Sequence, residues 1–215
     1  MEANKTIIVL KSAGLSIIVL IFSVGLGLGF IHISGFPYSA DIHALNISEF
    51  SGLSEEEITL NYNAVMDYLR PFNKAEFDLP TLGFTETGAE HFKDCRDIFN
   101  LVYLLSGLAG LSLLFLAVFK RKKITSSQLK LSGILTLAFP IILGLGLAVN
   151  FDNLFLLFHS LIFEQGSWVF NPAKDEIIKI LPGEFFMHCG MLLLGVCIFF
   201  GLLQFSLGYV KANRE

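Results

Sequence analysis

Four long apolar runs alternate with polar connections along the chain. The runs cover residues 12–33, 98–119, 131–149 and 185–210. Each is close to or above the roughly 20 residues that an α-helix needs to cross a hydrocarbon core of about 30 Å. Because lipid offers the backbone no hydrogen bonds, such runs form helices. The pattern predicts an all-α membrane protein with four transmembrane helices in a single membrane domain.

The two long connections, residues 34–97 and 150–184, are expected to form one cap. Ser54 followed by Glu57 is a capping-box signature, and apolar residues at helical spacing predict an amphipathic helix over residues 55–70. Between residues 72 and 85, proline and glycine interrupt the apolar residues, so short strands or turns are expected there. The prediction is a mainly helical cap in which short strands are allowed.

Two helices are expected to carry histidines beyond the apolar runs. If the second long helix begins near Thr87, His91 and Asp94 share one of its faces above the second run. The third helix is predicted to continue through residues 151–163. There, residues at i, i+4 spacing form one stripe, namely Phe151, Phe155, His159 and Phe163.

The connection that follows contains the single tryptophan, Trp168, and then Asn171-Pro172. Asparagine followed by proline is typical of a helix N-terminus, so a short helix is predicted to begin there. Trp168 has two readings, one as a ring that stacks on a substrate and one as an anchor at the membrane interface.

Basic residues mark one side of the membrane. They precede the first run and follow the fourth, and five lie between the second and third runs: Lys120, Arg121, Lys122, Lys123 and Lys130. The positive-inside rule predicts cytoplasmic termini, a cytoplasmic 120–130 loop and an extracellular cap. The net charge of −4 arises mainly in the cap and gives no indication of nucleic-acid binding. Twenty-two phenylalanines and 53% apolar residues agree with a membrane protein.

Several kinds of chemistry lack their sequence signatures. The chain has no GxSxG, HExxH, CxxC or phosphate-loop motif, and its three cysteines suggest neither a disulfide framework nor a zinc site. Gln204 is a strongly polar side chain within the fourth run, but no run contains Asp, Glu, Lys or Arg, so a charge relay for transport is not expected. Two possibilities remain: acid-base chemistry by histidine at the outer membrane surface, or no chemistry at all.

All five histidines lie on the predicted outer side or at its boundary: His32, His43, His91, His159 and His188. His32 and His188 stand at ends of apolar runs and are interpreted as structural. His91 and His159 have polar company in an apolar setting. Asp94, one turn from His91, either fixes the tautomer of that ring or belongs to a solvated pair.

Three segments carry a resemblance to a known family. NYNAVMDYL, EHFKDCRDIF and FHSLIFEQGSWVFNPAKDEIIKILPGEFF resemble the bacterial lipoprotein intramolecular transacylases, four-span membrane proteins with an extracellular cap. The resemblance extends over essentially the whole chain. Cys95 and Arg96 stand where the family pattern leads us to expect valine and lysine, a difference that concerns local packing.

The resemblance implies an acyl transfer within one substrate, a diacylglyceryl lipoprotein in the bacterial cell membrane. The sn-2 acyl chain would move to the α-amino group of the N-terminal cysteine, giving a lyso-form lipoprotein. The implied catalytic residues are His91 and His159, and neither cofactor nor metal is implied. An aromatic-rich substrate pocket is expected, and we assign to it Tyr62, Asp94, Phe155, Phe158, Phe163 and Trp168.

Two other functions stay open at this point. A non-enzymatic membrane protein would use the cap to bind lipid or a partner, with structural or pH-sensing histidines. A lipoprotein or phospholipid hydrolase at the same site would release free fatty acid instead of forming an N-acyl chain.

Overall fold

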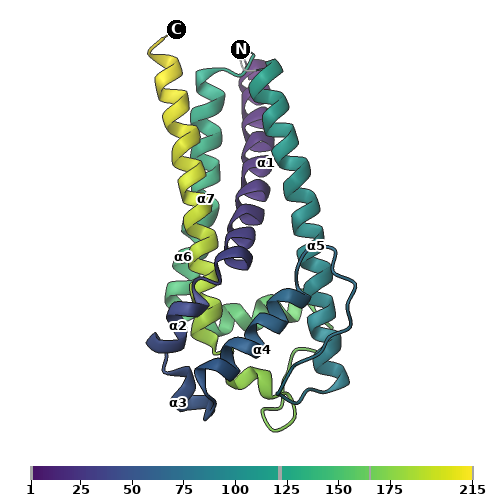
Figure 1. Ribbon diagram of the computed structural model, residues 1–215. Helices are drawn as coiled ribbons and strands as arrows, with labels where there is room; N and C mark the ends of the chain where they lie inside the picture. The colour runs from purple at the N-terminus through teal and green to yellow at the C-terminus, as the bar shows by residue number, and fades with distance from the viewer. Residues whose placement is uncertain (1, 121–122, 165, 215) are drawn as a thin grey trace. The chain divides into compact units, whose positions relative to one another are not determined.

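The computed structural model describes residues 2–120, 123–164 and 166–214. The elements in chain order are α1 (Glu2–Ser34), α2 (Tyr38–Ala44), α3 (Ile47–Ser51), α4 (Glu55–Tyr68), α5 (Glu86–Phe115), the π-helix η1 (Leu116–Lys120), α6 (Ser126–Ile162), the 3-10 helix η2 (Glu176–Lys179) and α7 (Gly183–Ala212) (Figure 1). The described residues contain no strand, so the all-α prediction is confirmed and the short strands allowed for the cap do not form. Two residues of the predicted basic loop, Arg121 and Lys122, lie outside the described residues.

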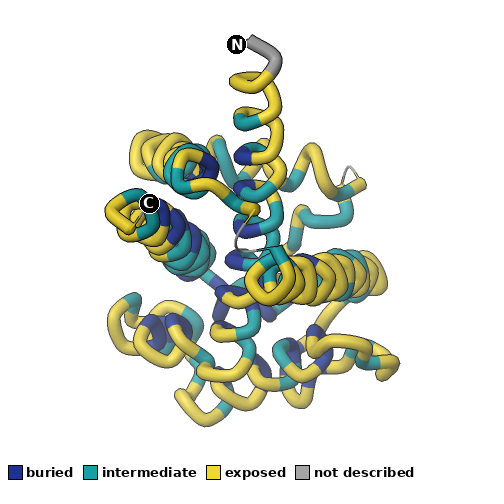
Figure 2. Tube along the Cα trace, turned by 90° about the horizontal axis from the view of Figure 1, so that it is seen from above, coloured by how far each residue is buried: buried dark blue, intermediate teal, exposed yellow. Residues whose placement is uncertain are grey.

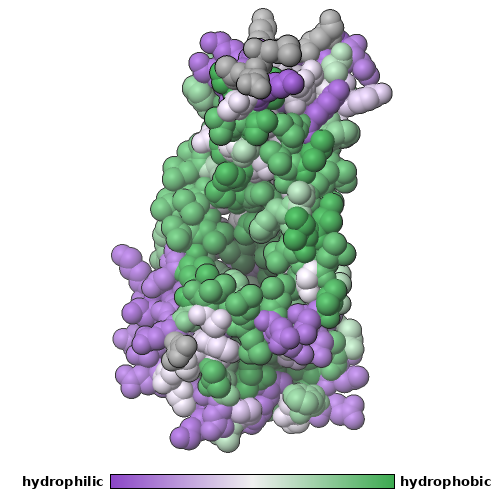
Figure 3. All heavy atoms as spheres, turned by 180° about the vertical axis from the view of Figure 1, so that it is seen from behind, coloured by the Kyte–Doolittle hydropathy of each residue, from purple (hydrophilic) through white to green (hydrophobic). Residues whose placement is uncertain are grey.

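Within the described part of the chain, four helices are long and apolar enough to cross a membrane, as predicted. They comprise Asn4–Ser34, Glu86–Lys120, Ser126–Ile162 and Gly183–Ala212. Figure 3 shows hydrophobic residues gathered over these long helices. The chain divides into two compact units. The bundle unit consists of Met1–Gly29, Val102–Ala148 and Met191–Glu215, and the cap unit of Phe30–Leu101 and Val149–Gly190.

Small residues bring the helices of the bundle unit together. A Cβ atom at Gly133 would lie 2.6 Å from the backbone nitrogen of Phe205, and one at Gly201 would lie 2.8 Å from the Leu137 side chain. Only a residue without a side chain fits such close approaches between helices. The buried residues lie on the sides of the helices that face one another, whereas the outer sides are exposed (Figure 2).

Hydrogen bonds between side chains add to this packing. The Thr136 hydroxyl is hydrogen-bonded to Gln204 Oε1 at 2.7 Å and to the Ser16 hydroxyl at 3.0 Å. Gln204 Nε2 donates to the Ser132 hydroxyl at 3.1 Å. Gln204, the polar residue noted within the fourth run, therefore joins α7 to α6 inside the bundle.

In the cap unit, α4 forms where its capping signature predicts. The Ser54 hydroxyl accepts the backbone N–H of Glu57 at 3.2 Å, and the helix ends at Tyr68, two residues before the predicted end. Tyr62 on α4 stacks on Tyr38 with ring centroids 3.6 Å apart, and the edges of both rings meet Phe185. These aromatic contacts hold α4 against α2 and the start of α7.

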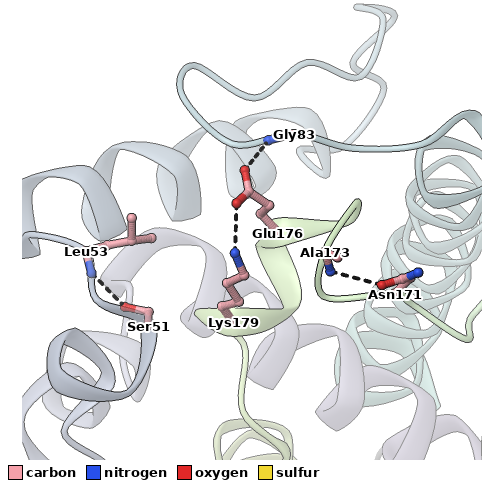
Figure 4. Close-up of polar contacts among 7 residues, drawn as sticks. All are labelled: Ser51, Leu53, Gly83, Asn171, Ala173, Glu176 and Lys179. Atoms are coloured by element: carbon pink, nitrogen blue, oxygen red, sulfur yellow. Dashed lines mark hydrogen bonds and ion pairs between the residues drawn. The ribbon is translucent and has the colours of Figure 1, made fainter.

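The prediction that a helix begins at Asn171 is wrong. Asn171 instead opens a turn, in which its side-chain oxygen accepts the Ala173 N–H at 3.0 Å (Figure 4). The Asn171 carbonyl accepts the Asp175 N–H at 2.7 Å. Only the short η2 follows, and Glu176 there bonds to both Gly83 N–H and Lys179. Hydrogen bonds to side chains and to a distant loop satisfy this backbone in place of a regular helix.

The third long helix continues through residues 151–162, as predicted, but it is broken at Asn150. This residue has φ −159° and ψ 83°, outside the helical region. The Asn150 side-chain oxygen accepts the N–H of Asn153 at 3.1 Å, as a helix N-cap does. Asn150 therefore starts a separate helical segment that carries His159.

Candidate active site

His91 lies in the second turn of α5 and is buried, with 6% of its surface exposed. Its ring is 4.5 Å from that of Phe163 and 5.4 Å from that of Phe170, measured between centroids. The helix start is fixed nearby, because the Thr85 hydroxyl accepts the Gly88 N–H at 3.1 Å and donates to Asp175 at 2.7 Å. His91 thus has a defined position among aromatic rings.

His159 lies in the last turn of α6, within the predicted aromatic stripe. Its Nδ1 is 2.8 Å from the carbonyl oxygen of Phe155. Because a carbonyl only accepts, Nδ1 carries the hydrogen, and Nε2 is the unprotonated nitrogen of the neutral ring. The Phe155 ring lies 4.1 Å away and the Trp168 ring 5.1 Å away, so the partly buried imidazole packs against aromatic rings.

The two histidines lie side by side in the cap unit. Their ring centroids are 6.0 Å apart, with 31° between the ring planes. Phe163 contacts both rings, at 4.5 Å from His91 and 5.4 Å from His159. Like charges at this separation repel, so protonation of one imidazole disfavours protonation of the other. At most one imidazole of the pair is therefore charged at a time, and the other keeps a basic nitrogen.

The two nitrogens of His91 have different surroundings. Nε2 lies 3.5 Å from the Cys95 sulfur, whereas Nδ1 is buried and has no hydrogen-bond partner among the described residues. Trp168 Nε1 is also buried and without such a partner. His91 Nδ1 and Trp168 Nε1 are therefore suited to contact polar atoms of a bound molecule.

The structure brings most of the predicted site residues together, but not all. Phe155, Phe158, Phe163 and Trp168 contact His159. Tyr62 is not brought to the histidines by any described contact, since it packs on Tyr38 and Phe185.

Asp94 makes no described hydrogen bond to His91. Cys95, at i, i+4 spacing from His91, takes that position instead. The i, i+4 spacing of Cys95 from His91 could have predicted their contact from the sequence. Phe170 also contacts His91, but no local pattern in the sequence predicts that contact.

The other three histidines have different surroundings. His188 Nδ1 lies 2.8 Å from the carboxylate of Asp41, and His43 lies 3.4 Å from Glu55 on the surface. The His32 ring meets the edge of Phe99. These contacts agree with structural roles for His32 and His188.

The fold and the paired histidines define a membrane-integral, all-α protein with a candidate acid-base centre in its cap unit. A sequence profile of the family described as "Lipoprotein intramolecular transacylase Lit" matches residues 13–186. The chain belongs to this family and is thereby a membrane-integral acyltransferase.

Solved structures support the same conclusion. The structure of the membrane integral lipoprotein intramolecular transacylase Lit from Bacillus cereus is 30% identical, with a TM-score of 0.88, over 100% of this chain and 98% of that one. A form of that protein with a histidine replaced by arginine has a TM-score of 0.83 at 30% identity, over 99% and 95% of the two chains. An uncharacterized protein of Aquifex aeolicus is 29% identical over 147 residues, which are 65% of this chain and 63% of that protein.

Proposed function

We propose that this protein moves the sn-2 acyl chain of a diacylglyceryl lipoprotein to the α-amino group of the lipoprotein's N-terminal cysteine. The observation that carries the proposal is the pair of imidazoles 6.0 Å apart within an aromatic enclosure. The chain's family and its Bacillus cereus relative are both named for an intramolecular acyl transfer on lipoproteins. Acid-base chemistry by two histidines suits such a transfer.

His159 acts as the base in this proposal. The α-ammonium group, with a pKa near 7.7–8.0, must lose a proton before its nitrogen attacks an ester, and a neutral imidazole is suited to accept one. The hydrogen bond from Nδ1 to the Phe155 carbonyl leaves Nε2 as the atom that takes the proton. The same bond holds the ring in one orientation.

His91 acts as the acid. In its protonated form it stabilises the oxyanion that develops on the ester carbonyl. As the bond between the carbonyl carbon and the glyceryl oxygen breaks, His91 gives its proton to that oxygen. The attacking nitrogen loses its second proton to the histidine pair, which replaces the proton that His91 gave up, and the new amide bond remains. Nδ1 is the nitrogen in contact with the substrate, since Nε2 lies against Cys95. The products are an N-acyl chain and a free sn-2 hydroxyl group.

Positioning and exclusion of water supply the remaining catalysis. Amine and ester belong to one molecule, and well-aligned groups of that kind reach effective molarities of about 10⁵ M or more. Phe163 lies against both histidines, so its ring shields one side of the pair from water. Such shielding favours transfer to the amine over hydrolysis.

The cap lies outside the cell in this proposal, and both termini lie in the cytoplasm of the host bacterium. The basic residues beside the apolar runs support this orientation. An alkaline phosphatase domain fused after Arg214 tests it, because that enzyme folds only outside the cytoplasm. We expect an inactive fusion, and an active one would contradict the orientation.

The acyl transfer is tested in a host that lacks other lipoprotein N-acylation. His91→Ala, His159→Ala and the native chain are expressed there, and N-terminal lipopeptides are analysed by mass spectrometry. We expect N-acylated lyso-form peptides with the native chain and a loss of at least 100-fold with each variant, a size typical of removing an acid-base group. His43→Ala is the matched control, since the His43 side chain is exposed and pairs with Glu55 on the surface.

The same peptides distinguish the alternatives. A binding protein leaves the acyl chain on the ester oxygen in every sample, and a hydrolase yields lyso peptides with a free amine. N-acylated lyso peptides at native levels from both alanine variants would refute the roles of His91 and His159.

A further inference from the structure

The connection between α4 and α5 holds an exposed aromatic residue in an unusual backbone conformation. Phe72 has φ 61°, in the left-handed region, and 69% of its surface is exposed. A side chain disfavours this conformation, which glycine and asparagine adopt most readily. Neither local backbone preference nor packing within the chain explains a phenylalanine at this position.

The connection is fastened to α5 at two points one turn apart. The Phe72 N–H donates to the side-chain oxygen of Asn100 at 2.8 Å, and the Arg96 guanidinium donates to the Ala75 carbonyl at 2.8 Å. The same guanidinium lies 4.3 Å from the centre of the Tyr68 ring. The connection therefore runs beside α5, as Figure 1 also shows.

These attachment points coincide with the start of the second apolar run. Arg96 and Asp97 precede the run, Ile98 begins it, and Leu101 is 54% exposed. A helix that passes from charged to exposed apolar residues crosses the boundary between headgroups and hydrocarbon. The bond to Asn100 places the backbone of Phe72 at that boundary.

We propose that residues 71–74 form an interfacial anchor that inserts the Phe72 ring into the lipid bilayer on the cap side. Aromatic rings concentrate at this depth in membrane proteins, where basic side chains extend toward lipid phosphates. Lys74, two residues after Phe72, is exposed and suits that second role.

A protein partner fits this surface less well. Stable protein interfaces bury about 800 Å² on each side, far more than one ring in a short turn offers. The exposed surface of Leu101, directly after Asn100, instead connects the loop to a lipid-facing helix. The anchor is independent of the acyl-transfer chemistry.

Tryptophan fluorescence tests the depth of residue 72. The variant Phe72→Trp is made in a Trp168→Phe background, so that it carries one tryptophan, and is reconstituted in phosphatidylcholine vesicles with brominated acyl chains. Phe50→Trp in the same background is the matched control, since Phe50 is 78% exposed and lies on α3. We expect shallow bromines to quench residue 72 at least twofold, while aqueous acrylamide quenches mainly residue 50.

Strong acrylamide quenching of residue 72, or equal bromine quenching at both positions, would overturn the proposal. Proteolysis gives a second measurement that needs no tryptophan. Asparagine tolerates left-handed backbone, so Phe72→Asn keeps the turn and removes the apolar ring. In vesicles with the cap outside, we expect trypsin to cut after Lys74 at least fivefold faster in Phe72→Asn than in the native chain. Equal rates would also overturn the anchor.

Discussion

Replacement of Asp175 by alanine tests how the cap unit is held together. The Asp175 side chain is buried, with 4% of the residue exposed. Its Oδ1 accepts the Thr85 N–H at 2.8 Å and the Thr85 hydroxyl at 2.7 Å, and its Oδ2 accepts the Asn171 N–H at 3.3 Å. One carboxylate thus joins the loop that follows Trp168 to the beginning of α5, two turns before His91.

The expected loss of stability follows from those bonds. Hydrogen bonds to a charged acceptor contribute about 1.5–3 kcal/mol each. Thr85 is partly exposed, so in the variant water can hydrogen-bond to Thr85 and restore part of the stability that the two short bonds contribute. We therefore expect Asp175→Ala to lower the free energy of unfolding by about 2–4 kcal/mol. For a chain of this size, that corresponds to a decrease in Tm of about 5–15 °C.

Thermal unfolding in detergent measures this effect, with a thiol-reactive dye that labels cysteines as they become exposed. Cys197 is buried and Cys189 partly buried, so both report unfolding. Lys179→Ala is the control, because the Glu176–Lys179 pair is about one-third exposed and contributes less than about 1 kcal/mol. Equal Tm values for Asp175→Ala and Lys179→Ala would refute the reasoning.

The same carboxylate predicts an acid limit to stability. Burial opposes its ionisation, but the hydrogen bonds from Thr85 and Asn171 prevail and hold the pKa of Asp175 below its usual value. A depressed folded-state pKa contributes stability above the unfolded value, near 3.9, and this is lost as the pH falls through the folded value. The Tm of the native chain should therefore fall below about pH 4, and that of Asp175→Ala should fall less steeply.

Three further predictions concern the site and the bundle. Cys95→Val removes the contact to His91 Nε2, a weak bond that contributes about 0.5–1 kcal/mol. In a turnover assay, acyl transfer by this variant should be about two- to fivefold slower than by the native chain. The rate of Cys95→Ser should be closer to the native rate. Phe163→Ala opens the enclosure, so the ratio of free fatty acid to N-acyl product, measured by mass spectrometry, should rise several-fold; an unchanged ratio would contradict the water-exclusion argument. Gln204→Leu breaks the bonds to Thr136 and Ser132 and should cost about 0.5–2 kcal/mol by denaturant titration in detergent.

Features with local causes were predictable from the sequence. The helix α4 follows from Ser54 and an apolar period, and the four long helices follow from the lengths of the apolar runs. The aromatic stripe around His159 follows from i, i+4 spacing, and its ring contacts are present. In each case, neighbouring residues alone determine the geometry.

Features that depend on distant partners were not predictable in the same way. Asn171-Pro172 looks like a helix start, but Asp175 forms its bonds with Thr85 and Asn171 instead of capping a helix. The same helix contains Pro140, and a proline is the usual cause of a kink. The non-helical backbone nevertheless lies at Asn150, ten residues later. Neither outcome is encoded by spacing alone.

The pairing of His91 with His159 lies between these cases. The sequence places each ring on a helix that continues beyond an apolar run, and the family resemblance selects these two from five histidines. Their separation of 6.0 Å and the position of Phe163 between them depend on the fold of the whole cap unit.

The central claim, that His91 and His159 act as one acid-base unit, is tested most directly with purified protein and a synthetic diacylglyceryl lipopeptide. Formation of the N-acyl product in a single turnover is compared for the native chain, His91→Ala, His159→Ala and the double variant. Groups that act as a unit are strongly non-additive, so we predict that the double variant is about as slow as either single variant. Single variants that keep the native rate, or losses that multiply in the double variant, would contradict the account.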